Sequence, residues 1–296
     1  MTVTYNHEPF IEQAVQSVLS QVTSFPFELV IGEDCSTDAT RALVERMARE
    51  NPETVRLKSQ IRNLGPARNF ADTFERCKGE FIAILDGDDY WTCPDKLEKQ
   101  VHFLEQNPDF VACFHDVEIH EPGQEPRLST EPGLSPVLEL KDLFRNNPIA
   151  TLSIVMRNHV LSDFPAWFNE CPVGDWPLYM LIAAHGKIGY FNEVMGVYRI
   201  HGGSIFGGEG TEHDLLCQAA VLEKVSGYFE PQIEQIIRRE LTRRHYSLAR
   251  CYWHRGAYGK SLKRALMTVV SRPILQNLDW KLKMIARMLG GGFLSR

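Results

Sequence analysis

Short apolar segments and amphipathic segments alternate over the first 120 residues of the chain. Apolar runs typical of strands occur at 3–5, 27–32, 55–59, 80–85 and 110–120. Between them, apolar residues recur at helical spacing near 9–21, 38–50, 65–77 and 92–106. Continuous apolar runs bounded by turn residues are typical of strands that are buried on both faces. The pattern therefore predicts an α/β fold with a mainly parallel sheet flanked by helices.

The rest of the sequence divides into a mixed region and a helical region. Residues 121–137 are rich in Pro, Gly and Glu and predict a surface loop, and residues 138–203 contain two helical and two strand-like segments. A Gly-rich segment at 205–213 follows, and the pattern is helical from 214 onward, with a hairpin that turns at Gly256. We therefore expect a catalytic-type domain at 1–213 and a basic helical extension at 214–296.

The charge of the chain follows the same division. Residues 238–296 hold 14 Lys and Arg against 2 Asp and Glu, a net charge of +12, whereas the remaining residues hold 18 against 36, a net charge of −18. This asymmetry excludes a uniformly acidic enzyme and a uniformly basic nucleic-acid-binding protein. No recognised binding motif accompanies the basic segment, so we expect no nucleic-acid partner.

The cysteines and the hydropathy pattern bear on the cellular compartment. The seven cysteines are odd in number and include no CxxC pair, which favours a reducing cytoplasm over a disulfide framework or a structural zinc site. The sequence contains no run of the ~18 apolar residues that span a bilayer and no signal-peptide layout. The first residues, MTVTY, read as the end of a buried strand, so we expect a few residues to be missing upstream.

Acidic residues follow two of the predicted strands. They are Glu33 and Asp34, after 27–32, and Asp86, Asp88 and Asp89, after 80–85. The carboxyl ends of parallel strands form the edge at which ligands bind, and carboxylates gathered there repel one another unless a cation or a ligand donor compensates them. Asp86 and Asp88 can together address one Mg²⁺ or Mn²⁺ that bridges to a diphosphate. The alternative is that Asp-Gly-Asp-Asp is turn chemistry at the end of a strand.

The sequence resembles the inverting family 2 glycosyltransferases, which have the GT-A fold. The resemblance covers about residues 2–201 and is carried, in the family's order, by VTYNHEPFIEQAVQSVLSQ, FELVIGEDCSTDAT, LDGDDYW and VGDWPLYM. It implies that the first strand and the turn after FELVIG hold a nucleotide. Thr4, Tyr5, Asn6 and Glu8 would then line the base and ribose pocket, and Asp34 would accept a hydrogen bond from a uracil imide N–H.

The same resemblance implies a diphosphate and metal site. Asp86 and Asp88 match the family's DxD motif, with Asp88 coordinating the metal directly and Asp86 nearer the ribose and diphosphate. Within YRIHGGS, His201 is a candidate third metal ligand and Arg199 would lie near the phosphates; a structural or surface histidine is the alternative. Arg68 follows a Gly-Pro turn at a predicted helix start, a place that suits anions; the alternative is a solvated helix cation. The other nine histidines show no ligand spacing and receive no role.

Asp175 falls where the family places its catalytic base. An acceptor hydroxyl must lose its proton as it attacks the anomeric carbon, so a carboxylate is required there. Many relatives have a Glu before this Asp, whereas Gly174 stands here; the alternative is that Asp175 only caps its helix. Trp91 and Trp176 are either sugar-stacking platforms or, as is usual for single tryptophans, core residues.

The resemblance implies a metal-dependent inverting glycosyltransferase, and the acidic clusters at the strand ends support this independently. We expect it to use Mn²⁺ or Mg²⁺ and to move a sugar from a nucleotide-sugar donor, a UDP-sugar, to a hydroxyl of a glycan or lipid-linked acceptor in cell-surface polysaccharide or glycolipid synthesis. A sugar-phosphate nucleotidyltransferase would need a Gly-rich, Arg-containing phosphate loop near the N-terminus, which NHEPFIEQ does not resemble. The other alternative is a non-catalytic sugar- or protein-binding module, against which the complete set of acidic residues argues.

The basic extension includes an amphipathic segment at 278–289. One face carries Leu278, Leu282, Ile285 and Leu289, and Lys281, Lys283 and Arg287 lie elsewhere around it. This pattern is compatible with peripheral contact with an anionic membrane, where lipid-linked acceptors reside. It would place the protein in the cytoplasm on the inner face of the plasma membrane. The alternative is a helix packed on its own domain with a solvated basic face.

Overall fold

The computed structural model describes residues 1–145, 147–161, 163–203 and 211–270, and the chain forms two compact units, residues 1–204 and 205–296. The first unit is the α/β domain that the sequence predicted. The second is helical throughout its described residues. The exact boundary at 213 remains a prediction.

A four-stranded parallel sheet lies in the first unit, in the order β3–β2–β1–β5. Its strands are β1 (Thr2–Thr4), β2 (Leu29–Glu33), β3 (Val55–Ser59) and β5 (Leu85–Asp86). All residues of β2 are buried, as expected for an apolar run between two neighbouring strands. The register places Thr4 beside Glu33 and Val3 beside Asp86. The acidic residues after β2 and β5 therefore flank the end of β1.

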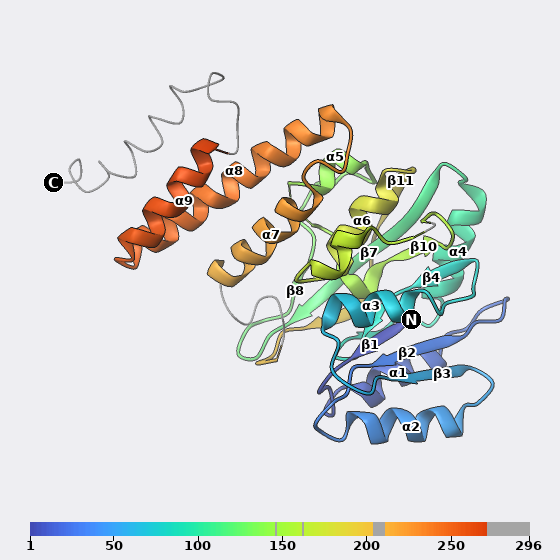
Figure 1. Cartoon of the computed structure of the whole chain (residues 1–296). Coiled ribbons are helices and arrows are strands. Elements are labelled where there is room, and N and C mark those ends of the chain that lie inside the picture. The colour runs from blue at the N-terminus through green and yellow to red at the C-terminus, as the bar shows by residue number, and fades with distance from the viewer. Residues whose placement is uncertain (146, 162, 204–210, 271–296) are drawn as a thin grey trace. The chain divides into compact units, whose positions relative to one another are not determined.

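Three helices connect these strands, as the hydrophobic spacing predicted. They are α1 (Ile11–Leu19), α2 (Thr40–Glu50) and α3 (Pro66–Phe74). The buried apolar residues of α1 are Ile11, Ala14, Val15 and Val18, which recur on one face of the helix. Figure 1 shows α1 and α2 on one side of the parallel sheet and α3 on the other. Both faces of the sheet are thus covered.

The run EFIAIL forms two strands rather than the single strand that we predicted. β4 (Phe81–Ala83) pairs antiparallel with β10 (Val155–Arg157), whereas β5 pairs parallel with β1. Ile84, between them, is fully buried and its N–H donates to the Ile154 carbonyl oxygen at 3.4 Å. The chain changes sheets at this residue. An unbroken apolar run cannot reveal such a change, because both halves are buried.

A second, mixed sheet has the order β4–β10–β7–β11–β6. Its other strands are β7 (Phe110–His120), β11 (Lys187–Arg199) and β6 (Tyr90–Trp91), with the short β8 (Arg127–Leu128) on β7 and β9 (Val137–Leu138) on β11. β7 and β11 run parallel, and the remaining pairings of this sheet are antiparallel. The fold prediction is confirmed, with the parallel sheet limited to four strands.

Helical segments complete the core of the first unit. They are α4 (Lys96–Gln106), α5 (Leu140–Leu143), α6 (Asp175–Ala183) and the 3₁₀ turns η1 (Thr151–Ser153) and η2 (Ala166–Glu170). The indole N–H of Trp91 donates to the Leu152 carbonyl oxygen at 2.7 Å, and that of Trp176 to the Leu143 carbonyl oxygen at 2.9 Å. Both indoles are buried. Of the two interpretations of these tryptophans, the structure supports core residues.

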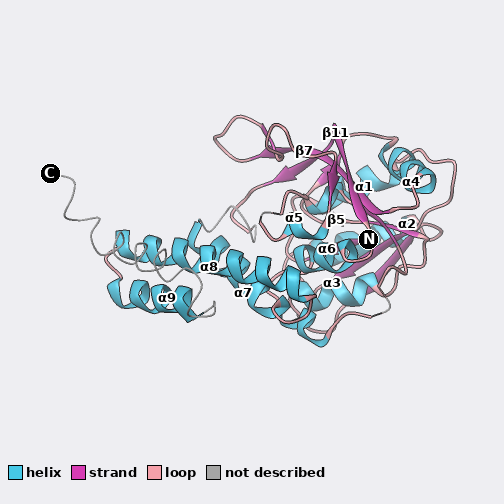
Figure 2. Ribbon diagram, turned by 90° about the horizontal axis from the view of Figure 1, so that it is seen from above, coloured by secondary structure: helices cyan, strands magenta, loops and turns pink. Residues whose placement is uncertain are grey.

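The second unit contains α7 (Thr211–Val225), α8 (Pro231–His254) and α9 (Tyr258–Val270). α8 and α9 form the predicted hairpin, and Gly256 adopts a left-handed φ of 72° at its turn (Figure 2). α9 buries Ser261 and Ala265, and exposes three apolar side chains at four-residue spacing: Tyr258, Leu262 and Leu266. Among the described helices, none is long and apolar enough to cross a membrane. The segment 278–289 and most of 205–213 lie outside the described residues.

Candidate active site

The turn at residues 86–89, called the acidic turn below, is packed against the end of β1. The Gly87 N–H donates to the Val3 carbonyl oxygen at 3.0 Å. A Cβ atom on Gly87 would lie 2.6 Å from Thr4 Oγ1 and 2.9 Å from His7 Nδ1, closer than real side chains approach. Glycine is therefore required between the two aspartates, and its absence of a side chain brings them against the segment at residues 4–7.

Two imidazoles converge on Asp88. Its Oδ2 lies 3.0 Å from His201 Nε2 and 3.6 Å from His7 Nε2. Burial alone would raise the pKa of Asp88, but the His201 hydrogen bond and the charges of both histidines outweigh burial and lower it. Because His201 Nδ1 accepts the Gly203 N–H at 3.2 Å, Nε2 is the nitrogen that carries the proton toward Asp88. The structure thus joins Asp88 and His201 directly.

His7 was not predicted from the sequence as a site residue. Its neighbour Glu8 was selected from the family motif, whereas His7 has no ligand spacing with another histidine. Burial is the main cause that lowers the pKa of His7. Only the close packing of residues 4–7 on Gly87 brings this imidazole to Asp88. In the sequence, only the position of His7 shortly after the first strand indicates that it could lie at the ligand-binding edge of the sheet.

Asp86 and Asp175 lie close together although 89 positions separate them in the sequence. Burial raises the pKa of Asp86 well above its usual range, and the negative charges of Asp88 and Asp175 raise it further. Burial also raises the pKa of Asp175, the first residue of α6, whose Oδ2 accepts a hydrogen bond from Thr151 Oγ1 at 3.3 Å. Three of the predicted site residues are therefore brought together at one place.

Asp89 and Arg199 tie the turn to β11. Asp89 is fully buried, and its Oδ1 accepts the backbone N–H of Arg199 at 2.8 Å. Burial, with the charges of Asp88 and Asp86, raises the pKa of Asp89 well above its usual range. The Arg199 guanidinium donates to the Asp88 carbonyl oxygen at 2.7 Å and lies 4.3 Å from the centre of the Tyr90 ring. The predicted phosphate residue is thus fixed beside the acidic turn.

The four residues assigned to the base and ribose pocket lie in different surroundings. Thr4 is buried, and its hydroxyl has no hydrogen-bond partner among the described residues, whereas Tyr5 is 41% exposed. Asn6 has a left-handed φ of 55°, a conformation in which Asn is among the better-tolerated side chains. Its Oδ1 accepts the Thr37 N–H at 2.8 Å. Asn6 therefore links the end of β1 to the turn after β2.

Glu8 makes the second link between these turns. Its Oε2 accepts the Ala39 N–H at 3.0 Å, and its own N–H donates to Asp38 Oδ2 at 3.1 Å. Asp38 Oδ1 also accepts the Thr40 N–H at 3.0 Å, so that Asp38 shapes the start of α2. In this structure the hydrogen bonds of Glu8 stabilise the turn that leads into α2.

Asp34 closes the loop that leads into α3. Its Oδ1 accepts the Leu64 N–H at 2.7 Å and its Oδ2 accepts the Gly65 N–H at 3.0 Å. Burial raises the pKa of Asp34, and these two hydrogen bonds oppose the rise. Each carboxylate oxygen keeps a second lone pair for a ligand. Arg68, one turn further along the chain, is exposed on α3.

Gly174 explains why no second acid precedes Asp175. A Cβ atom at position 174 would lie 2.9 Å from the Phe70 ring, so α3 occupies the space that a glutamate side chain would need. The single carboxylate at this helix start is a consequence of close packing between α3 and the segment before α6.

The acidic turn fits a divalent cation that is bound mainly through a ligand's phosphates. Among the described residues, no three His, Cys, Asp or Glu side chains are grouped to hold a metal by themselves. Mg²⁺ commonly takes only one or two carboxylates and completes its shell with phosphates and water. Asp86 and Asp88 can supply those carboxylates, and a cation would offset the mutual repulsion that, after burial, raises the pKa of Asp86 and of Asp89. The Oδ2 of Asp89 has no hydrogen-bond partner among the described residues.

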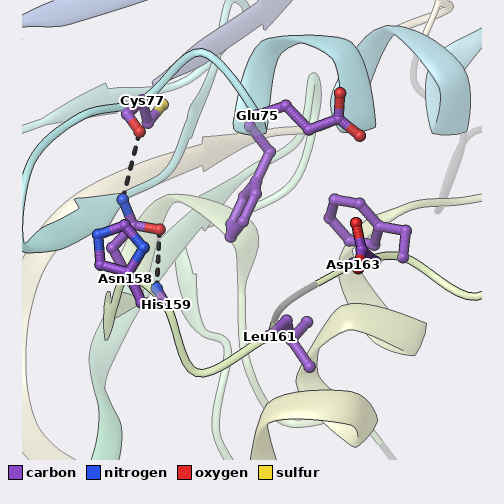
Figure 3. Close-up of a pocket in the computed structure, with 8 residues that line it drawn as sticks. Glu75, Cys77, Asn158, His159, Leu161 and Asp163 are labelled. Atoms are coloured by element: carbon purple, nitrogen blue, oxygen red, sulfur yellow. Dashed lines mark hydrogen bonds between the residues drawn. The ribbon is translucent and has the colours of Figure 1, made fainter.

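A cavity of about 200 Å³ lies elsewhere in the first unit (Figure 3). It is lined by Phe74, Glu75, Cys77, Asn158, His159, Leu161, Asp163 and Phe164. Asn158 Nδ2 donates to the Cys77 carbonyl oxygen at 3.2 Å, and the His159 N–H donates to Asn158 Oδ1 at 2.9 Å. None of its lining residues belongs to the acidic turn, so it contributes nothing to the site described above.

Comparison with known proteins gave consistent matches. The family model described as Glycosyl transferase family 2 matches residues 1–163. The uncharacterized protein Rv1520 of Mycobacterium tuberculosis is 37% identical over 212 residues, which are 70% of this chain and 59% of that protein. The chain thus spans about 59% of the length of this relative.

Two further matches are more distant. UDP-Glc:alpha-D-GlcNAc-diphosphoundecaprenol beta-1,3-glucosyltransferase WfaP of Escherichia coli is 28% identical over 225 residues, 75% of this chain and 83% of that protein. The crystal structure of S. aureus TarS 1–349 in complex with UDP-GlcNAc superimposes with a TM-score of 0.67 at 19% identity, covering 92% of this chain and 80% of that one. The latter match supports the fold.

Proposed function

Because this chain belongs to glycosyl transferase family 2, we propose that it transfers a sugar, with inversion, from a UDP-sugar to a hydroxyl of a glycan or lipid-linked acceptor in cell-surface polysaccharide or glycolipid synthesis. The names of two matches support the donor and acceptor classes. WfaP is named for UDP-Glc and a diphosphoundecaprenol-linked sugar, and TarS was crystallised with UDP-GlcNAc.

The convergence of Asp86, Asp88 and Asp175 carries this proposal. Thr151 of η1 donates to Asp175, and η1 packs against β5, the strand that ends at Asp86. Burial and then the charges of Asp88 and Asp175 raise the pKa of Asp86, as expected for three neighbouring carboxylates. Inverting transfer needs two activities on opposite faces of the sugar: stabilisation of the leaving diphosphate and removal of the acceptor proton. Two carboxylates on the turn and one on α6 provide these activities from separate elements.

On the leaving-group side, Asp86 and Asp88 would hold Mn²⁺ or Mg²⁺, with His201 as a third ligand through Nε2 once the cation has displaced the proton that Nε2 directs at Asp88. The bound cation would supply charge neutralisation for the departing diphosphate. His201 is already within hydrogen-bond distance of Asp88, and Arg199 lies beside the same turn. Arg199 would add a second positive charge near the phosphates, and exposed Arg68 a third.

At the nucleotide end, Thr4, Tyr5, Asn6 and Glu8 would line the base and ribose pocket. Asp34 would accept the uracil imide N–H through a lone pair that the loop amides leave. The orphaned Thr4 hydroxyl supports this arrangement, because a buried polar group without a partner calls for one.

On the acceptor side, Asp175 would take the proton of the attacking hydroxyl. A buried carboxylate with a raised pKa is a better base than an exposed one. The acceptor oxygen forms its bond to the anomeric carbon as the diphosphate oxygen leaves, and the acceptor proton passes to Asp175. This single displacement inverts the configuration and requires no covalent enzyme intermediate.

The second unit supports a peripheral contact with an anionic membrane as part of this proposal. Residues 231–270 contain nine Lys and Arg and two Asp and Glu. The exposed apolar side chains of α9 are accompanied by exposed Lys260 and Lys263 on the same helix. Apolar and basic groups together are typical of surfaces that bind anionic lipids.

Calorimetric titration with UDP tests the proposed function. We expect the wild-type protein to bind UDP in the presence of Mn²⁺ and to bind it at least tenfold more weakly after chelation of the metal. Asp88→Asn should abolish the metal dependence, and Asp109→Asn should keep it, because the Asp109 side chain is 80% exposed at the surface. Equal binding with and without metal would overturn the role of the acidic turn, and a protein that binds no UDP in either condition would favour the non-catalytic alternative.

A further inference from the structure

The Thr151 hydroxyl lies near two partly buried carboxylates, Asp175 and Asp86, and the buried Tyr179. It donates to Asp175 Oδ2 at 3.3 Å. It is also close enough to Asp86 and to Tyr179 to lower the pKa of each, against the stronger effect of burial. Thr151 begins η1, which packs against β5, the strand that ends at Asp86. One hydroxyl group thus connects the acidic turn with the start of α6.

Tyr179 adds a group that the proposed mechanism leaves unexplained. It lies one turn after Asp175 on α6 and is fully buried. In this structure its hydroxyl makes no hydrogen bond to a described residue, although Thr151 lies near enough to lower its pKa. Burial, followed by the charges of Asp175 and Asp86, raises its pKa well above the usual range. Tyr179 therefore stays protonated, as a neutral donor without a satisfied acceptor.

The chemistry of a threonine hydroxyl restricts the arrangement. It has one proton to donate and two lone pairs to accept with. It can therefore serve only one of the two carboxylates at a time, and in this structure it serves Asp175. A lone pair of Oγ1 remains for a donor, and the Tyr179 hydroxyl is a buried donor at this place. Adjacent hydrogen bonds of this kind strengthen one another in a buried site.

We propose that Tyr179 and Thr151 form a hydrogen-bond relay that holds Asp175 in position, with the Tyr179 hydroxyl donating to Thr151 Oγ1 and Thr151 donating to Asp175 Oδ2. Both are positioning residues, and the proposal rests on the proposed role of Asp175 as base. The relay fixes the plane of the carboxylate, so that Oδ1 is the oxygen presented to an acceptor. A catalytic carboxylate loses much of its effect if it is displaced by about 1 Å from the reacting proton.

Turnover of four variants tests the relay in the full-length chain, with UDP release from UDP-glucose and UDP-GlcNAc as the readout. Thr151→Val removes the donor but keeps the shape, and we expect kcat to fall about 10- to 100-fold while KM for the donor stays within about twofold. Thr151→Ser keeps the hydroxyl and should restore most of the activity. Tyr179→Phe should have a smaller effect, and the double variant Thr151→Val/Tyr179→Phe should be no worse than Thr151→Val, because Tyr179 acts only through Thr151.

Three outcomes of these measurements would overturn the relay. They are wild-type turnover in Thr151→Val, equal loss in Thr151→Ser and Thr151→Val, and multiplication of the two losses in the double variant. If the wild-type protein turns over neither UDP-sugar, that result counts against the proposed function and not against the relay. A second measurement, of stability, tests the relay in that case. In urea unfolding, the destabilisation by Thr151→Val and that by Tyr179→Phe should combine to less than their sum, because each removes the same hydrogen bond; additive effects would overturn the relay independently of activity.

Discussion

The two units keep their unusual side chains in opposite surroundings. The first unit buries charged groups, including fully buried Asp89 and Lys96, whereas the second exposes the apolar Tyr258, Leu262 and Leu266. Burying a charge and exposing an apolar stripe both cost stability, and both are tolerated where a ligand or a surface compensates them. The proposed site of the first unit therefore consists of groups withdrawn from water, whereas the exposed apolar stripe of α9 in the second unit faces it.

The largest expected effect separates chemistry from binding in the first unit. Asp175→Asn should lower kcat by about 10²- to 10⁴-fold, the usual contribution of a general base, and leave Mn²⁺-dependent binding of UDP unchanged. UDP release from UDP-sugars measures the first quantity and calorimetry the second. Unchanged turnover would remove Asp175 as the base, and loss of UDP binding would show that it serves the donor instead.

Close packing around the acidic turn can be compared with open packing in the second unit. Gly87→Ala places a Cβ atom 2.6 Å from Thr4 Oγ1, so we expect it to lower the free energy of unfolding by about 1–3 kcal/mol and to weaken UDP binding. Gly259→Ala on α9 has open space around the new methyl group and should be neutral or stabilising. Urea denaturation of both variants provides the comparison, and equal effects would show that the turn is not tightly packed.

Lys96 makes the stability of the first unit depend on pH. Burial lowers the pKa of Lys96 from 10.5 to about 7, and its ammonium lies 4.2 Å from the centre of the Trp91 ring without a hydrogen-bond partner among the described residues. Between pH 7 and 10 the unfolded chain binds the proton that the folded chain has lost, so the free energy of unfolding should rise with pH, by about 1 kcal/mol per unit. Lys96→Met should remove this slope. The exposed Lys187→Met should retain it, and a slope that survives in Lys96→Met would assign it to another group.

The smallest effect on stability is expected on α9. Leu262 and Leu266 are 59% and 55% exposed, so Leu262→Glu/Leu266→Glu should change the free energy of unfolding by less than about 0.5 kcal/mol per site. If α9 contacts an anionic membrane, this double variant should cosediment less with phosphatidylglycerol vesicles than the wild-type protein does. Leu128→Glu, at a similarly exposed leucine of the first unit, should sediment as the wild type does. Equal sedimentation of all three proteins would contradict membrane contact through α9.

Local sequence patterns predicted those parts of the molecule that local physics decides. The buried strand at 29–33, the amphipathic α1 and the hairpin at Gly256 follow from the spacing of apolar residues and from turn chemistry. The proximity of Asp86 and Asp88 to Asp175 was expected only through the resemblance to a family, because no local pattern relates α6 to the turn.

The other contacts of the candidate site depend on packing between segments that are distant in the sequence, and they were not predicted. Thr151 belongs to no motif, yet its hydroxyl donates to Asp175 because η1, which packs against β5, lies beside the start of α6. His7 reaches Asp88 only across the bare Gly87. Asp34, selected as a nucleotide residue, also anchors a loop 30 positions away. In each case the contact depends on which helices, strands and loops pack against one another. The spacing of hydrophobic residues along the sequence does not predict that.

The change of sheets at Ile84 has a consequence for how the first unit unfolds. The six-residue run at 80–85 contributes one strand to each sheet, so neither sheet can lose this segment while the other keeps its full set of strands. Amide hydrogen exchange should therefore report the two sheets opening together, with similar protection in β1 and β10. We therefore expect the first unit to unfold as one cooperative element. The acidic turn at residues 86–89 lies next to the point at which its two sheets are joined.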